Sequence, residues 1–465
     1  MTTKTKQTVC CIVSLAFLLP LLRGAYVQPL FGATADGAGF GGVVSFGLYG
    51  VTLVVAALVL VAGEKGVARF LERRTAIAAL TVIGLAGFLL CFLRDGAAVF
   101  GGAALLAVFL AGSLALWAEV LAGFSPARMI ACASVGFVAS FFTHLIAQLP
   151  SPVPDVQMLL VPLVSGSARL WCGEVPRRSD RSFLDVSKEL PLGFALSMAL
   201  FCLVGNLFRG ITGAFQTSLV SDSVFYMTAA NLSIGLIIIV LVVFHVRTQK
   251  LLFWCWFVFS LGFLVGVFLS AFPDGTLLKV GSDIVTLSRV GIEFLLFLCV
   301  ILIIAKTGTY SPGMLGALFI LPVGLSVLLR GVVAPLVAHA VGEQLLGSFP
   351  IIVLGAGFAL LFAQYAFVGK TYFEGFFESR EAAGDGDCEQ DALDSLHRAY
   401  GLTERETTVA SYIAKGYSLN KIADLLSLSP NTIRSHYRSI YRKCAVHKRQ
   451  ELIELVETLK GRSLL

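Results

Sequence analysis

Charged residues are scarce in this sequence. Asp, Glu, Lys and Arg together make up 14% of its 465 residues, whereas soluble globular proteins average about 25%. Hydrophobic residues make up 57%, and the mean hydropathy is +0.85. Apolar stretches of about twenty residues, long enough to cross a bilayer as a helix, recur along most of the chain. This composition excludes an ordinary soluble protein and predicts a helical protein with many membrane spans.

Several chemical motifs are also absent. The sequence has no Cys-x-x-Cys pair and no Cys/His cluster at zinc-ligand spacing. It has no P-loop, His-Glu-x-x-His or Gly-x-Ser-x-Gly motif. The glycine-rich "GAGFGG" at 37–42 leads into an apolar span and does not join a strand to a helix. We interpret the ten cysteines as small hydrophobic residues and predict no enzyme activity, no metal site and no cofactor.

The N-terminus has two interpretations. "MTTKTKQTVCCIVSLAFLLPLLRGAY" has the basic start and apolar run of a signal peptide. Arg23 directly follows that run, and further spans come after it. We therefore expect a retained first span.

The apolar stretches predict an all-α fold in which a bundle of twelve spans occupies residues 1–369. The expected spans are Thr8–Leu22, Gly42–Ala62, Ala76–Leu93, Ala97–Leu121, Met129–Gln148, Gln157–Cys172, Pro191–Phe208, Phe225–Val246, Leu251–Phe272, Ile284–Ala305, Met314–Val333 and Leu346–Val368.

The basic residues of the loops predict the orientation. If the N-terminus lies inside, the inner loops hold 15 Lys and Arg residues and the outer loops hold 4, counted on the printed sequence. Inner loops of membrane proteins carry this excess of positive charge. We expect a multi-pass protein of the inner (cytoplasmic) membrane with both termini in the cytoplasm.

A long polar inner loop, "GEVPRRSDRSFLDVSKEL" at 173–190, separates two halves of six spans each. This layout resembles the major facilitator superfamily of transporters. That family has a Gly/Asp/Arg-rich motif in the loop after the second span. Here the loop reads "GEKGVARFLERRT", which keeps the basic cluster without the spaced Gly-Asp-Arg pattern. The resemblance covers the layout alone.

The character of the chain changes after the last span. Residues 370–391 are acidic and dotted with Gly and Ala, which predicts a juxtamembrane helix and a linker. Residues 392–465 hold 12 Lys and Arg against 7 Asp and Glu, a balance of +5. A small, basic, soluble domain is expected there.

Four short helices are predicted in this domain. Thr403 and Glu406 have capping-box spacing, and the first helix runs from about 404 to 415. The second helix covers about 419–426. Ser429 caps the third, with Pro430 at its first position. The fourth covers about 448–460.

The third helix is both amphipathic and basic. Apolar residues recur in it at a spacing of three to four, and arginines fall on the other faces. Two short helices joined by a tight turn, the second of them basic, form a helix-turn-helix, whose second helix enters the DNA major groove. Arginine pairs there with guanine, and the other cations meet phosphates.

The domain resembles the LuxR/GerE family of DNA-binding domains. The pattern rests on Leu402, Thr403, Arg405, Glu406, Gly416, Ser418, Ile422, Ala423, Leu426, Ser429, Thr432, Ile433, Arg434, His436, Ile440, Lys443, Val446 and Arg449. Cys444 departs from it, because leucine is usual at that position.

The resemblance implies a DNA-binding surface and a homodimer on a two-fold operator, formed through the fourth helix. Bases are expected to meet Arg434, Ser435 and Arg438. Phosphates are expected to meet Lys421, Thr432 and His436, although an isolated histidine is more often a surface residue. The full predicted set for double-stranded DNA is Lys421, Ser429, Asn431, Thr432, Arg434, Ser435, His436, Arg438, Arg442 and Lys443.

Charged residues in the spans are candidates for a ligand site, because charge is costly inside a membrane. The candidates are Arg23, His144, Arg209, Arg289, Glu293 and Arg330. Arg289 and Glu293 are four residues apart and can pair on one helix face. A cluster of guanidinium groups would bind an anionic small molecule. The alternative is that long arginine side chains reach the lipid headgroups from span ends.

Three functions remain open on the sequence alone. In the first, the spans sense a ligand and control DNA binding by the C-terminal domain, as a one-component transcription regulator. In the second, a secondary transporter of the major facilitator type carries a DNA-binding regulatory tail. In the third, the spans are a passive anchor, for which twelve are far more than needed. Substrate flux with the tail removed would separate the first two.

Overall fold

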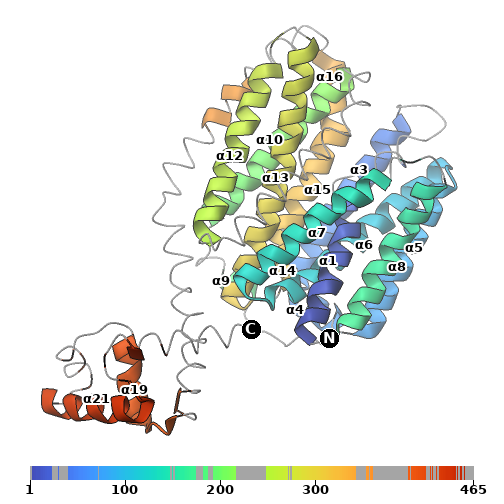
Figure 1. Cartoon of the computed structure of the whole chain (residues 1–465). Helices are drawn as coiled ribbons and strands as arrows, with labels where there is room; N and C mark the ends of the chain where they lie inside the picture. Colours follow the sequence, from blue (N-terminus) through green and yellow to red (C-terminus); the bar gives the residue numbers. More distant parts are fainter. Residues whose placement is uncertain are drawn as a thin grey trace. The chain divides into compact units, whose positions relative to one another are not determined.

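The computed structural model describes most of the apolar part of the chain and the central part of the C-terminal domain. The described residues are 3–22, 30, 40–71, 73–146, 149, 152–173, 182–186, 192–215, 248–270, 272, 275–309, 311–341, 352–355, 357–359, 396–397, 400–414, 419, 422, 426, 429–446, 448, 451–452 and 455. The chain divides into two compact units, Met1–Phe373 and Glu374–Leu465. All regular elements in the described ranges are helical (Figure 1).

The first unit, called the membrane unit below, is built from long apolar helices. They are α1 (Thr3–Leu22), α3 (Phe40–Ala62), α4 (Glu64–Leu71), α5 (Arg74–Phe92), α6 (Gly96–Ala122), α7 (Pro126–Ile146), α8 (Val153–Cys172), α9 (Phe183–Val186), α10 (Leu192–Phe215), α12 (Thr248–Ser270) and α13 (Gly275–Thr307). A further helical run, residues 311–341, follows.

Seven helices in the described residues are long and apolar enough to cross a membrane, and two shorter apolar helices accompany them. The predicted all-helical, multi-span architecture is confirmed. Helices coincide with ten of the twelve predicted spans. Span 225–246 lies outside the described residues, as does most of span 346–368. The α8 helix is 20 residues long but is not one of the seven. The total of twelve stays a prediction.

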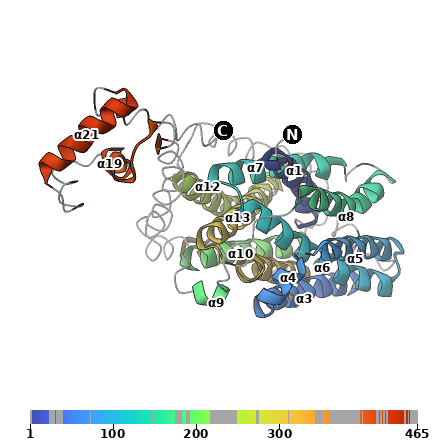
Figure 2. The same cartoon turned by 90° about the horizontal axis from the view of Figure 1, so that it is seen from below.

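The helices of each predicted half pack mainly against one another. In the first half α1 packs against α7 and α8, and α5 packs against α6 and α8. In the second half α13 packs against α10 and α12, side by side in both views (Figure 1 and Figure 2). In the apolar stretch of α13, 89% of the residues are buried, so this helix lies in the interior. Stacking of Phe137 on Phe294, with ring centroids 4.2 Å apart, links α7 to α13 across the halves.

The helical run 311–341 contains two π-helical segments. Its parts are α14 (Ser311–Leu315), η3 (Gly316–Ile320), α15 (Leu321–Leu328), η4 (Leu329–Val333) and α16 (Ala334–Val341). Each π segment ends two residues before a proline, Pro322 or Pro335. A proline ring clashes with the carbonyl four residues earlier and removes one N–H. Widening the preceding turn relieves that clash, which accounts for both π segments.

This run lies along α3 at very close distance. A Cβ atom placed on Gly331 would lie 2.5 Å from the Cβ of Phe46, and one on Gly324 would lie 3.1 Å from the Val54 nitrogen. Glycine therefore lets the two helices approach nearly backbone to backbone. The contact joins the second predicted span to the eleventh and so connects the two halves.

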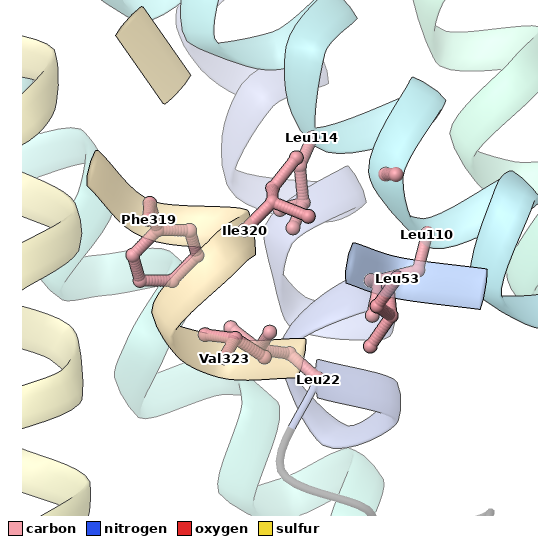
Figure 3. Close-up of a pocket in the computed structure, with 8 residues that line it drawn as sticks. Leu22, Leu53, Leu110, Leu114, Phe319, Ile320 and Val323 are labelled. Atoms are coloured by element: carbon pink, nitrogen blue, oxygen red, sulfur yellow. The ribbon is translucent and has the colours of Figure 1, made fainter. Parts of the chain in front are cut away.

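Apolar side chains fill the space beside this contact. A small, partly open gap there leaves no room for a water molecule (Figure 3). Its lining comes from α1, α3, α6, η3 and α15, and consists of Leu22, Leu53, Leu110, Ala111, Leu114, Phe319, Ile320 and Val323. In this conformation the halves are sealed here by packing.

The second unit has a hydrophobic core of its own. Its best-described helices are α19 (Glu404–Ala414) and α21 (Pro430–Cys444). Helical residues also occur at 419, 422 and 426 and at 451, 452 and 455, within the predicted second and fourth helices. The buried core consists of Leu396, Leu402, Val409, Ala410, Ile413, Ile422, Ile433, Ile440, Cys444 and Leu452. Cys444 thus fills a core position.

Candidate DNA-binding site and membrane polar cluster

The start and end of α21 are set by local sequence. The Ser429 hydroxyl accepts a hydrogen bond from the Thr432 N–H at 3.1 Å, and Pro430 occupies the first turn. The helix ends at Ala445, which has φ of 55°, and the Val446 N–H then donates to the Tyr441 carbonyl at 3.0 Å. The predicted cap is confirmed.

The two faces of α21 differ in burial and charge. Ile433 and Ile440 are fully buried, and the rings of Tyr437 and Tyr441 pack beside them with centroids 5.8 Å apart. The opposite face is exposed and consists of Asn431, Arg434, Ser435, Arg438 and Arg442. We call these five residues the basic face. Because α21 contains no Asp or Glu, its field is positive along its whole length.

The dimensions of α21 suit the DNA major groove. A helix of 15 residues is about 22 Å long at 1.5 Å per residue. The groove is about 12 Å wide and admits one helix. The basic face therefore presents side chains over most of a helix that fits the groove.

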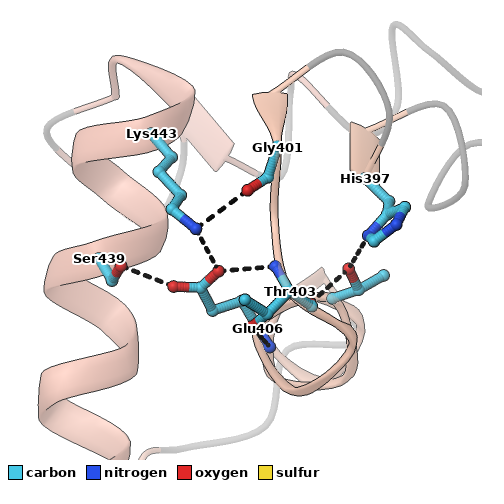
Figure 4. A network of polar contacts seen from close by, with 7 residues as sticks. His397, Gly401, Thr403, Glu406, Ser439 and Lys443 are labelled. Atoms are coloured by element: carbon cyan, nitrogen blue, oxygen red, sulfur yellow. Dashed lines mark hydrogen bonds and ion pairs between the residues drawn. The ribbon is translucent and has the colours of Figure 1, made fainter.

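A buried carboxylate ties α21 to the start of α19 (Figure 4). Glu406 accepts hydrogen bonds from the Thr403 N–H at 2.7 Å, the Ser439 hydroxyl at 2.6 Å and the Lys443 ammonium at 2.7 Å. The Glu406 N–H donates to the Thr403 hydroxyl at 3.3 Å, which completes the predicted capping box. Lys443 also donates to the Gly401 carbonyl at 2.9 Å. We call this set the Glu406 network.

The network stabilises the ionised form of the carboxyl. Burial by itself raises the pKa of Glu406, but the hydrogen bonds from Lys443, Ser439 and Thr403 together outweigh it and lower the pKa to about 2. The glutamate is therefore charged throughout the physiological range, and it holds α21 against α19.

The remaining residues predicted to meet DNA occupy different environments. The Ser429 and Thr432 hydroxyls lie 2.8 Å apart and are exposed. His436 is half-buried beside the basic face. Lys443 is half-exposed, but its ammonium is bound within the Glu406 network. Lys421 lies outside the described residues.

A polar cluster lies inside the membrane unit. The Arg289 guanidinium pairs with the Glu293 carboxylate at 2.6 Å, four residues further along α13, as the spacing predicted. Asn206 of α10 donates to the same carboxylate oxygen at 3.2 Å and to the Cys202 carbonyl at 2.8 Å. Arg289 is 5% exposed, and its Nε atom has no hydrogen-bond partner among the described residues. The Arg289 Nε–H group is thus a buried donor with no acceptor among the described residues.

The other membrane candidates are not brought into this cluster by described contacts. Arg330 is half-buried on η4, and its backbone lies against Gly210 of α10. Arg23 lies outside the described residues, as do the side chains of His144 and Arg209. These four stay predictions.

Comparison with known proteins identifies the second unit. Residues 401–456 match the model of the bacterial regulatory proteins of the luxR family. Residues 401–456 form a LuxR-type helix-turn-helix domain. The chain is also 39% identical over 64 residues to the HTH-type transcriptional regulators MalT of Yersinia pestis (strain Pestoides F) and Serratia proteamaculans (strain 568). The match covers 14% of this chain and 7% of the length of these relatives.

Solved structures similar to this chain include two membrane transporters. The human organic anion transporter MFSD10 (TETRAN) is 17% identical, with 77% of this chain and 98% of that chain covered and a TM-score of 0.49. The nucleoside transporter NupG is 17% identical, with 79% and 100% covered and a TM-score of 0.49.

Two polar residues now have roles that the sequence did not single out. Ser439 is the third partner of Glu406 in the LuxR-type domain. Glu64 is 6% exposed at the start of α4, and its carboxylate accepts the Phe183 N–H of α9 at 3.0 Å. Each depends on a partner distant in sequence, so spacing alone carries no signal for it.

Proposed function

We propose that this chain is a membrane-embedded, one-component transcription regulator. Its LuxR-type domain binds double-stranded DNA sequence-specifically, and its membrane unit controls that binding in response to a signal. The observation that carries the proposal is the exposed basic face of α21, in a domain typical of transcription regulators. Among the described residues of the same chain, seven helices are long and apolar enough to cross a membrane. The membrane unit, which would sense the signal, and the DNA-binding domain are thus parts of one polypeptide chain.

On DNA, the basic face reads the major groove. Arg434, Ser435 and Arg438 contact base edges, since they project from the middle of the exposed face. Asn431, Thr432 and His436, together with Lys421 and Arg442, contact the flanking phosphates. At the N-terminus of α21 the Thr432 and Ile433 N–H groups already donate to Ser429 and Pro430 has none, so the Asn431 N–H is the backbone donor left for a phosphate. Lys443 contacts a phosphate only by leaving Glu406, so its main role is structural.

The domain binds as a homodimer on a two-fold operator. A single short recognition helix reads few base pairs, and dimerisation doubles the site. We assign the contact to the fourth helix, of which Leu452 is buried in the core and Leu455 partly so.

The Arg289–Glu293–Asn206 cluster receives the signal. A buried guanidinium with an unused N–H attracts an anion, and a carboxylate group matches its planar geometry. The ligand is therefore a small organic anion that competes with Glu293 for Arg289. Opening of the contacts between α10 and α13 is needed for entry, because Arg289 is buried in this conformation.

The helical run 311–341 transmits the change. Its two π segments, each close to a proline, are places where the backbone hydrogen bonds can change register with a shift of the following residues. It contacts both α10, which carries Asn206, and α3. A ligand that binds one arrangement better shifts the population toward it.

The decisive experiment is genome-wide DNA occupancy of the full-length protein in its host. Discrete peaks over palindromic sequences are expected, and an Arg434→Ala, Arg438→Ala double variant should lose them. Arg405→Ala, which removes an exposed cation from α19, is the matched control and should keep them. If the control and the double variant give the same profile, α21 does not read DNA and the proposal is wrong.

A second experiment separates the regulator from a transporter with a regulatory tail. Solute uptake is measured in vesicles that contain residues 1–373. A sensor binds its anion without concentrating it. Accumulation against a gradient would show that the membrane unit transports.

A further inference from the structure

A second cationic cluster lies where α1, α7 and α8 meet, at the end of the membrane unit that carries Thr3. The Lys6 ammonium of α1 lies over the Trp171 ring of α8, and Arg169 lies two residues before Trp171, at the same end of α8. Arg128 of α7 donates to the Thr8 hydroxyl of α1 from Nε at 2.9 Å and from Nη2 at 2.5 Å. The N-terminal turns of α1 are thereby held between α7 and α8.

Arg169 has an N–H group that donates to none of the described residues. It is 7% exposed, near the end of α8. One Nη atom donates to the Gly173 carbonyl at 2.9 Å, where Gly173, with φ of 85°, ends the helix. Its Nε atom is buried and has no partner among the described residues. Burying a charged group without its hydrogen bonds costs free energy. An anion that accepts a hydrogen bond from this Nε atom would therefore stabilise the protein.

Helices α1, α7 and α8 supply no carboxylate near the Arg169 guanidinium. The sequences of α1 and α7 contain no Asp or Glu, and α8 contains only Asp155 in its first turn. Asp155 is fourteen residues before Arg169, about 21 Å along the helix axis. None of these three helices therefore brings a carboxylate to this end of the unit.

The same turn of α8 presents an apolar surface to the outside of the bundle. Leu170 is 46% exposed and Trp171 is 54% exposed. The Lys6 ammonium lies 4.9 Å from the centroid of the Trp171 ring. Tryptophan is enriched where lipid headgroups meet acyl chains. Cations and a lipid-facing apolar surface thus adjoin one another.

We propose that Lys6 and Arg169 bind the phosphate of an anionic phospholipid, with Trp171 and Leu170 against its first acyl-chain segment. Basic pockets between spanning helices bind anionic headgroups in this way. The exposed apolar pair favours a lipid over a soluble phosphate, because a free ion would gain nothing from it. The bound lipid joins α1 to α8. This site is independent of the proposed DNA regulation.

The test uses full-length protein in nanodiscs of phosphatidylcholine alone or of equal parts phosphatidylcholine and phosphatidylglycerol. Wild-type protein should retain phosphatidylglycerol in native mass spectrometry, and the lipid should raise its midpoint of thermal unfolding. A Lys6→Gln, Arg169→Gln double variant should retain about tenfold less, since each cation contributes a few-fold to the binding of an anionic lipid. The matched control is Lys65→Gln, Arg69→Gln, which removes two exposed cations from α4; it should behave as wild type.

Three outcomes would overturn the proposal. One is equal retention by the double variant and the wild type. Another is equal loss in the α4 control, which would mean that only net charge matters. The third is an equal rise of the unfolding midpoint with inorganic phosphate in phosphatidylcholine nanodiscs, which would make the site one for a soluble anion. Should the double variant fail to fold, Lys6→Gln alone, at a half-exposed position, must still weaken retention.

Discussion

At the scale of single residues, Glu406 connects the parts of the LuxR-type domain. Its carboxylate joins Thr403 at the start of α19 to Ser439 and Lys443 on the recognition helix. All these contacts favour the charged form, so the folding free energy of the second unit depends on pH through this one group.

The pH dependence follows from the sign of the shift. The pKa of Glu406 falls from an ordinary 4.5 to about 2 in the fold. The stabilisation is complete above pH 4.5 and is lost as pH falls toward 2. Its size is about 3 kcal/mol, at 1.36 kcal/mol per pKa unit. Urea unfolding of residues 374–465 between pH 2 and pH 7 should show this loss, and Glu406→Gln should remove most of it. Glu451→Gln, a carboxyl removed elsewhere in the unit, should leave it in place.

Lys443 could serve either to stabilise the fold or to contact DNA, and one substitution separates these two roles. Lys443→Met removes the ammonium that neutralises a buried carboxylate, which should destabilise the unit by about 1–3 kcal/mol. Under conditions where the variant is fully folded, its affinity for operator DNA should stay within a few-fold of the wild type. A large loss of affinity without loss of stability would instead place Lys443 on the DNA, as a member of the predicted DNA-binding set.

At the scale of elements, local sequence determines the recognition helix. The Ser429 cap, Pro430 and the spacing of Ile433 and Ile440 predicted α21 within a residue or two, because these signals act within one helix. The Glu406–Lys443 bond joins residues 37 apart in sequence and could not be predicted. The π segments before Pro322 and Pro335 were not predicted, and the contact of their helical run with α3 depends on packing between the halves.

The basic face should behave as a set of separable contacts. Arg434→Ala and Arg438→Ala should each cost about 1–3 kcal/mol in operator binding and relax the base preference at one position. Arg442→Ala should weaken binding to all sequences alike and lower the dependence of log K on log salt by about one unit. Fluorescence anisotropy across a salt series with residues 374–465 measures both. Equal salt slopes for all three variants would show that they contact phosphates alike.

The contact between α3 and the run 311–341 should tolerate no added volume. Gly331→Ala places a methyl group 2.5 Å from the Phe46 Cβ and forces the helices apart. The unfolding midpoint of the membrane unit in detergent should fall, by an amount equivalent to about 1–3 kcal/mol. Gly96→Ala is the control, because a Cβ atom there meets nothing within 4 Å. Equal midpoints for the two variants would contradict the close packing.

At the scale of the whole molecule, regulation by the membrane unit requires coupling in both directions. If a ligand in the Arg289–Glu293–Asn206 cluster changes DNA affinity by some factor, DNA must change ligand affinity by the same factor. DNA bound to the LuxR-type domain must therefore shift the conformations of the membrane unit. This consequence can be measured without knowing the ligand.

Hydrogen exchange in nanodiscs provides that measurement. Operator DNA added to the full-length protein should change the exchange of amides in Gly316–Ile320 and Leu329–Val333, because their π-helical bonds are the ones that rearrange. The interior of α6, which is largely buried and regular, should stay unchanged. The Arg434→Ala, Arg438→Ala variant should show neither binding nor change. If the wild type binds DNA while both π segments exchange as before, the two units are uncoupled. The spans would then serve only to hold the regulator at the membrane.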